Sequence, residues 1–81
     1  MAPHERITYN PKILSGKPII SGTRISVEQI LALLAKGVQS KEICEEFPDL
    51  KIEDVLAAVA YAQATIAAEE VRHADRVLSA V

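Results

Sequence analysis

Residues 15–29 read SGKPIISGTRISVEQ, and this stretch predicts the fold because a strand-turn-strand pattern runs directly into a helix start. Two short apolar segments, Pro18–Ile20 and Thr23–Ile25, are separated by Ser21-Gly22. A two-residue connection with a glycine that adopts positive φ without strain is typical of a hairpin. We therefore expect these two segments to pair as a short β-hairpin.

A phosphate-binding loop is the alternative interpretation of the same glycines. A P-loop requires the order GxxxxGK[ST], with the lysine after the second glycine and a helix directly behind it. Here Gly16-Lys17 comes first, and Gly22-Thr23 leads into Arg24 and an apolar residue. The order of residues favours turn glycines over a phosphate cradle.

Ser26 marks the start of the first helix. It is an N-cap residue, and Gln29 three positions later completes a capping box. Apolar residues then recur at helical spacing until Gly37, which ends the helix in the left-handed conformation. We predict this helix at residues 27–36.

Two further helices follow. Ser40 is the expected N-cap of a short helix at residues 41–47, which Pro48 ends because the residue before a proline avoids helical angles. A third helix begins between Leu50 and Ile52 and meets no helix breaker before the C-terminus. Together these elements predict a mostly α, helix-turn-helix domain of three helices, with a short N-terminal β-hairpin and a long C-terminal helix.

The third helix carries two apolar stripes. The first is expected to face the other two helices, and it consists of Ile52, Val55, Leu56, Val59, Ala62 and Ile66. The second has alternating spacings of three and four, which favours a close-packed seam with another chain. It consists of Ala57, Ala60, Ala64, Ala67, Val71, Ala74, Leu78 and Val81. We accordingly divide the chain into a hairpin and helix-turn-helix domain at residues 1–63 and a helical extension for dimerisation or partner binding at residues 64–81.

Composition and charge limit the class of protein. The chain has 81 residues, a formal net charge of −2 and a single cysteine. So small a domain has a marginal core, which favours a homo-oligomer, with a dimer expected. No signal peptide and no apolar run of membrane-spanning length is evident, so a cytoplasmic protein without a membrane partner is expected. The charge is uneven, since residues 1–24 carry a net +3 on an otherwise acidic chain.

The chain resembles a known bacterial family, domain of unknown function 433, whose members are often regarded as antitoxins of the VapB type. The central match is GKPII at residues 16–20 and GTRI at residues 22–25, and the whole resemblance covers residues 7–62. Further matching positions are Ile7-Thr8, Asn10-Pro11, Ile13-Leu14, Val27, Ile30-Leu31, Leu34, Gly37, Ile43, Phe47-Pro48, Leu50, Glu53-Asp54-Val55 and Ala60-Tyr61-Ala62. The resemblance implies a homeodomain-like helical fold, a small PIN-like nuclease toxin as partner, and autoregulatory binding to DNA.

The basic residues of the N-terminal third are the candidates for DNA contact. Direct base reading by the third helix is disfavoured, because its first turns offer acidic residues and alanines. Phosphate contacts are expected instead from Lys12, Lys17, Arg24 and Lys51. Arg24 has a competing structural role, pairing with one of the carboxylates Glu45, Glu46 or Asp49. The motif residues expected to serve turns and structure are Gly16, Pro18, Gly22, Thr23 and Arg24.

Catalysis and metal binding are not indicated. His4, His73 and Cys44 stand far apart in the sequence, and no nucleophile has a base at a defensible spacing. Metal sites need about four clustered donors. We expect no enzyme, no cofactor and no metal site.

The sequence therefore predicts a non-enzymatic, antitoxin-like protein that dimerises and captures a PIN-like nuclease toxin. One alternative is a DNA-binding transcriptional regulator that uses the basic hairpin. Another is a purely structural dimerisation module.

Overall fold

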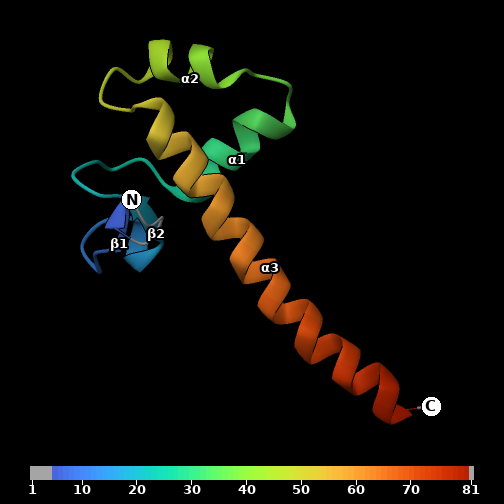
Figure 1. Cartoon of the computed structure of the whole chain (residues 1–81). Helices are drawn as coiled ribbons and strands as arrows, with labels where there is room; N and C mark the ends of the chain where they lie inside the picture. Colours follow the sequence, from blue (N-terminus) through green and yellow to red (C-terminus); the bar gives the residue numbers. More distant parts are fainter. Residues whose placement is uncertain (1–4, 81) are drawn as a thin grey trace.

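The computed structural model describes the backbone of residues 5–80 and the side chains of residues 5–69. Its elements, in chain order, are β1 (Ile7–Tyr9), a short 3-10 turn η2 (Leu14–Gly16), β2 (Pro18–Ile20), α1 (Val27–Ala35), α2 (Ser40–Glu46) and α3 (Ile52–Ala80) (Figure 1). The prediction of a mostly helical domain with a short N-terminal hairpin and a long C-terminal helix is confirmed.

The strand pairing of the hairpin differs from the predicted one. β1 pairs with β2 in antiparallel register, with Ile7 opposite Ile20 and Tyr9 opposite Pro18. The predicted second strand, Thr23–Ile25, is not a strand, and only one isolated bridge joins Ile19 to Ser26. The Ile20 amide donates to the Ile25 carbonyl at 2.9 Å, so residues 21–24 form a longer turn than the predicted Ser21-Gly22 connection. The Thr23 hydroxyl stabilises this turn, because it donates to the Ile20 carbonyl at 2.8 Å and accepts from the Ile25 amide at 3.0 Å.

The ends of α1 and α2 follow local capping chemistry. Ser26 Oγ accepts a hydrogen bond from the Gln29 amide at 2.9 Å, and Gly37 follows the helix with φ +89°. The predicted cap of α2 was wrong by one position. Its N-cap is Gln39, whose backbone N–H donates to Glu42 Oε1 at 3.3 Å, so that Ser40 is the first helical residue.

One apolar cluster joins the hairpin to the three helices. Its buried members are Ile7, Ile20, Val27, Ile30, Ile43, Leu50, Val55, Ala57 and Ala58. α3 packs against α1 and β1 and then continues away from them (Figure 1). Only the first turns of α3 therefore contribute buried residues.

The face of α3 that packs against the body is not the predicted one. Of the stripe expected in the core, Val55 is buried, but Ile52, Leu56, Val59 and Ile66 are 42%, 60%, 43% and 53% exposed. Ala57, assigned to the intermolecular seam, is 4% exposed and lies in the core. Small alanines allow the neighbouring elements to approach the helix closely, so the larger apolar residues are left on the outside.

Candidate functional site

A partly buried ion pair ties the start of the chain to the start of α3. Arg6 Nη1 donates to Asp54 Oδ1 at 2.8 Å, and the two side chains are 21% and 9% exposed. The second oxygen, Asp54 Oδ2, accepts from the Lys51 backbone N–H at 2.9 Å. The carboxylate thus caps α3 from its third residue while pairing with the guanidinium. Sequence reasoning missed this pair, although an acid three positions after a helix cap is a known signal.

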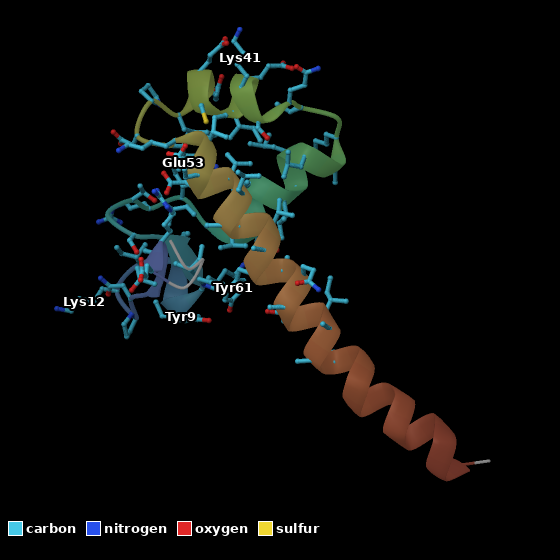
Figure 2. All side chains as sticks on the ribbon, in the orientation of Figure 1. Tyr9, Lys12, Lys41, Glu53 and Tyr61 are labelled. Carbon is cyan, nitrogen blue, oxygen red and sulfur yellow. The ribbon has the colours of Figure 1, made fainter. Side chains whose placement is uncertain are left out.

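A second link between hairpin and helix is made by two tyrosines. The hydroxyls of Tyr9 in β1 and Tyr61 in α3 form a short hydrogen bond (Figure 2). This hydrogen bond, with smaller effects of burial and of the neighbouring phenol, raises the pKa of Tyr9. The contact links β1 to α3 across 52 residues of sequence.

The predicted DNA-contacting residues are in different environments. Lys17 Nζ pairs with Glu28 Oε2 at 3.0 Å in an exposed ion pair. Lys12 is exposed and points away from the body (Figure 2), while its backbone N–H donates to Asn10 Oδ1 at 2.9 Å. Lys51 is exposed at the start of α3. One of the four cations is therefore already neutralised by a neighbour.

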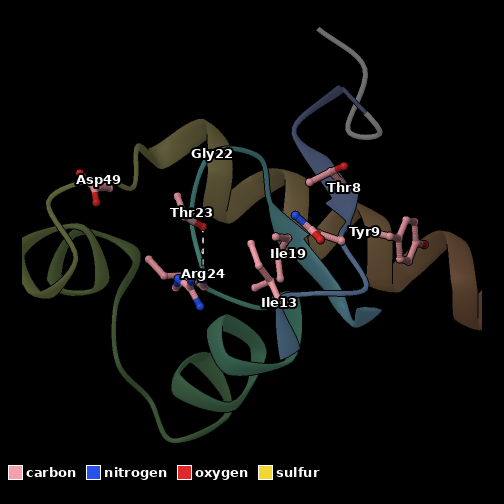
Figure 3. Close-up of a pocket in the computed structure, with 10 residues that line it drawn as sticks. Thr8, Tyr9, Ile13, Ile19, Gly22, Thr23, Arg24 and Asp49 are labelled. Atoms are coloured by element: carbon pink, nitrogen blue, oxygen red, sulfur yellow. Dashed lines mark hydrogen bonds between the residues drawn. The ribbon is translucent and has the colours of Figure 1, made fainter. Parts of the chain in front are cut away.

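Arg24 lies at the rim of an open hollow between the hairpin and the turn that precedes α3. The hollow has a volume of about 650 Å³ and an apolar floor that includes Ile13, Ile19 and Ile25 (Figure 3). Asp49 lies on the same rim, but among the described residues Arg24 forms no ion pair. The predicted pairing of Arg24 with Glu45, Glu46 or Asp49 was therefore wrong. The ion pair between Arg6 and Asp54 links the hairpin region to α3 instead.

The motif glycines of the hairpin region adopt left-handed backbone angles. Gly16 and Gly22 both have φ +80°, and Leu14 and Ser15 directly before Gly16 also have positive φ. Pro18 opens β2, where its missing N–H is tolerated at the strand start. Together with the Thr23 hydrogen bonds, these features show that the GKPII and GTRI segments form the turns on either side of β2.

Within the described side chains of α3, the exposed large apolar residues Ile52, Leu56, Val59 and Ile66 are here called the outer stripe. Beside it, a groove of about 380 Å³ is lined by Leu31 of α1 and by Val59, Ala62, Gln63, Ile66 and Ala67 of α3. Apolar exposure of this kind on a small domain makes the outer stripe a candidate interaction surface. Of the predicted seam, Ala64 is exposed and Ala60 and Ala67 are half-buried, while Val71, Ala74, Leu78 and Val81 lie outside the described side chains.

Groups with catalytic or metal-binding chemistry are not brought together in the described part of the chain. No cluster of three or more His, Cys, Asp or Glu residues suited to a metal ion occurs among residues 5–69. Cys44 is half-buried, and burial, then the charges of Asp54 and Glu53, raise the pKa of its thiol. His4 and His73 lie outside the described side chains. Across the described residues, each helix is too short or too polar to span a bilayer.

Comparison with known proteins places the fold and the motifs in one family. The chain is 36% identical over 63 residues to the uncharacterized protein y4eO of Sinorhizobium fredii, an alignment that covers 78% of this chain and 28% of that protein. The chain thus spans little more than a quarter of this relative. A crystal structure of a DUF433 member from Anabaena variabilis superposes with a TM-score of 0.71 at 29% identity, covering 85% of this chain and 68% of that one. The family described as "Protein of unknown function (DUF433)" matches residues 7–62. The chain therefore belongs to the DUF433 family.

Proposed function

We propose that this protein is a non-enzymatic, antitoxin-like binding protein of the cytoplasm that dimerises and captures a partner protein through the projecting part of α3. The partner proposed is a small PIN-like nuclease, the kind of toxin that the antitoxin resemblance implies. In this proposal the helix lies across the nuclease groove and blocks access of the substrate.

The observation that supports this proposal is the length of α3 beyond the body. α3 has 29 residues, and none of its described side chains after Ala58 is buried. An isolated helix gains little stability from propensity alone, so a helix of this length is usually stabilised by packing against something. The sequence of the projecting part combines apolar positions with acidic residues, a pattern that suits a groove with a basic rim.

The test is co-expression of the full chain, tagged at its N-terminus, with the product of the adjacent gene. Stoichiometric co-purification is expected for the unmodified chain. The double variant Val71→Asp and Leu78→Asp should lose the partner, because it places charges on the apolar side of the projecting helix. The control Ser79→Asp adds one negative charge off that stripe, against two in the double variant, and should retain the partner. Equal capture by all three chains would contradict this use of the helix.

A second candidate function, DNA binding by the basic hairpin region, is favoured by one specific observation. Lys12 and Arg24 are exposed, and neither forms an ion pair with any described residue. Free surface cations of this kind are suited to phosphate contacts, which position a protein on DNA without reading sequence.

Salt-dependent DNA binding tests this candidate. The variant Lys12→Ala with Arg24→Ala should lower the slope of log affinity against log salt by about 0.9 per lost phosphate contact. Lys41→Ala is the control, because Lys41 is exposed on α2, away from the hairpin (Figure 2). An unchanged slope in the double variant would exclude the hairpin as the DNA contact. If neither partner protein nor DNA binds, a structural dimerisation module remains as the function.

A further inference from the structure

We infer that the outer stripe of α3 is the surface on which two copies of this chain dimerise, and that the two α3 helices pair antiparallel. This inference deepens the dimerisation part of the proposed function and does not depend on capture of a nuclease. It also moves the dimer surface from the alanine-rich seam to a neighbouring face, roughly 100° around the helix.

The width and spacing of the outer stripe match a helix-pair seam. Successive helical residues are turned by about 100°, so Ile52, Leu56, Val59 and Ile66 fall within an arc of roughly 80°. The buried residues Asp54, Ala57 and Ala58 lie on the other side of the helix. Counting Gln63, the stripe advances by alternating steps of four and three residues, the spacing of a and d positions in a two-stranded coiled coil. A wide core-facing surface would instead need additional apolar positions on each flank.

The groove beside the stripe can receive the second helix. Its lining includes Leu31 of α1 and Val59, Ala62 and Ile66 of α3. In an antiparallel pair whose twofold axis lies level with residue 61, Leu56 faces Ile66 of the partner subunit and Val59 faces Gln63 of the partner subunit. The segment from Ile52 to Ile66 spans about 21 Å, which is roughly four helical turns. In this register a second copy covers the stripe from Leu56 to Ile66, and Ile52 lies level with residue 70 of the partner subunit.

The charges at the two ends of the stripe complement each other in the antiparallel arrangement. Lys51 precedes Ile52 at one end, Glu69 follows Ile66 at the other, and both are exposed. They are 18 residues apart, which is about five full turns, so both lie on the same flank of the helix. A twofold axis perpendicular to the helices brings like flanks together, so each Lys51 approaches Glu69 of the partner subunit. In a parallel pair each flank would face the opposite flank, and Lys51 would lie level with Glu53 of the partner subunit.

Sedimentation velocity of the full chain at several concentrations is the first test. We expect a monomer–dimer equilibrium that Leu56→Glu weakens at least about tenfold in Kd. Leu56 is exposed in the monomer, so the variant should keep the helical circular dichroism of the unmodified chain. The control Ala64→Glu places the same charge on an exposed position outside the outer stripe and should leave Kd unchanged. A monomer at every concentration, or a dimer lost only in Ala64→Glu, would overturn the inference.

Disulfide trapping tests the orientation. In a Cys44→Ser background, Leu56→Cys and Ile66→Cys chains are prepared separately, mixed, and oxidised in a glutathione buffer. An antiparallel dimer should give the mixed 56–66 disulfide as the main cross-linked species, since only facing positions bring two Cβ atoms close enough to bridge. Predominant 56–56 and 66–66 products would establish a parallel pair and overturn the antiparallel assignment.

Discussion

At the scale of single residues, Asp54 is the side chain on which most local structure depends. Its two oxygens accept from two different partners, the Arg6 guanidinium and the Lys51 backbone N–H. One residue thereby joins the segment before β1 to the first turn of α3, across a sequence separation of 48 residues. Removing one partner of a largely buried pair costs more than the pair contributes, because the remaining charge stays desolvated.

We predict that Arg6→Ala lowers the free energy of unfolding by about 2 kcal/mol, a value reduced from that of a fully buried pair because Arg6 is partly exposed. The matched control is Lys17→Ala, which breaks the exposed pair with Glu28 and should cost less than about 1 kcal/mol. Urea unfolding of both variants measures the difference. The double variant Arg6→Ala and Asp54→Asn should recover part of the loss, and equal effects of Arg6→Ala and Lys17→Ala would show that the pair has no special weight.

The tyrosine pair gives a prediction on pH. The chain has two tyrosines, so in Tyr61→Phe the phenolate absorbance reports Tyr9 alone. The hydrogen bond to Tyr61 raises the pKa of Tyr9, and its loss should bring the titration of Tyr9 back toward the ordinary value of about 10. Because the pKa of Tyr9 is higher in the folded state than in the unfolded state, the contribution of this hydrogen bond to stability is fully present below the unfolded pKa. It is lost as the pH rises through the folded pKa. If the midpoint of the absorbance titration is no lower in Tyr61→Phe than in the unmodified chain, the hydrogen bond to Tyr61 is not the cause of the raised pKa of Tyr9.

At the scale of elements, the helix caps show how a shift of one residue changes the effect of a mutation. Ser26 is buried and its hydroxyl accepts from the Gln29 amide, whereas Ser40 lies inside α2 behind the true cap, Gln39. We predict that Ser26→Ala lowers the free energy of unfolding by about 1 kcal/mol. Ser40→Ala, the matched control, should change it by less than about 0.5 kcal/mol. Denaturant midpoints of the two variants measure this, and a larger loss for Ser40→Ala would place the cap of α2 at the residue predicted from the sequence.

The elements that could be predicted from the sequence are those specified by local chemistry. α1 follows from Ser26, Gln29 and Gly37, and the left-handed angles follow from the glycines. The strand partner of Pro18–Ile20 could not be predicted in the same way, because the Thr23 hydroxyl bonds the Ile20 carbonyl and the Ile25 amide and stabilises a turn at residues 21–24 in place of a second strand. Such a competing side-chain hydrogen bond is decided by three-dimensional geometry and not by apolar alternation.

The orientation of α3 shows a second limit of sequence reasoning. Larger apolar residues were expected in the core, yet alanines occupy it and the outer stripe faces away from the chain's own body. Either stripe satisfies a 3.6-residue period, and the choice depends on how closely α1 and the hairpin approach the helix. The Arg6–Asp54 pair and the Tyr9–Tyr61 contact join the N-terminal segment to α3, and both link residues far apart in the sequence. The candidate interaction surface therefore emerged only from the structure.

At the scale of the whole molecule, the domain has a core at one end and a bare helix at the other, with extents of 50 × 30 × 24 Å. A domain of this size buries a smaller share of its surface than a large domain does, and the outer stripe is among the apolar surface that the fold leaves uncovered. A second copy placed antiparallel brings the body of each chain toward the projecting helix of the other. Stability and association are then coupled in this molecule.

This coupling predicts that the melting temperature of the full chain rises with protein concentration. Binding to the folded state alone stabilises it by mass action, so a dimer of folded chains melts later when more of it is formed. Leu56→Glu should remove the concentration dependence. Its melting temperature should be close to that of the dilute unmodified chain, because the Leu56 side chain is mostly exposed in the monomer. Ala64→Glu should keep the dependence. Calorimetric scans over a wide concentration range measure all three chains, and identical melting temperatures of the unmodified chain at every concentration would show that folding and association are independent.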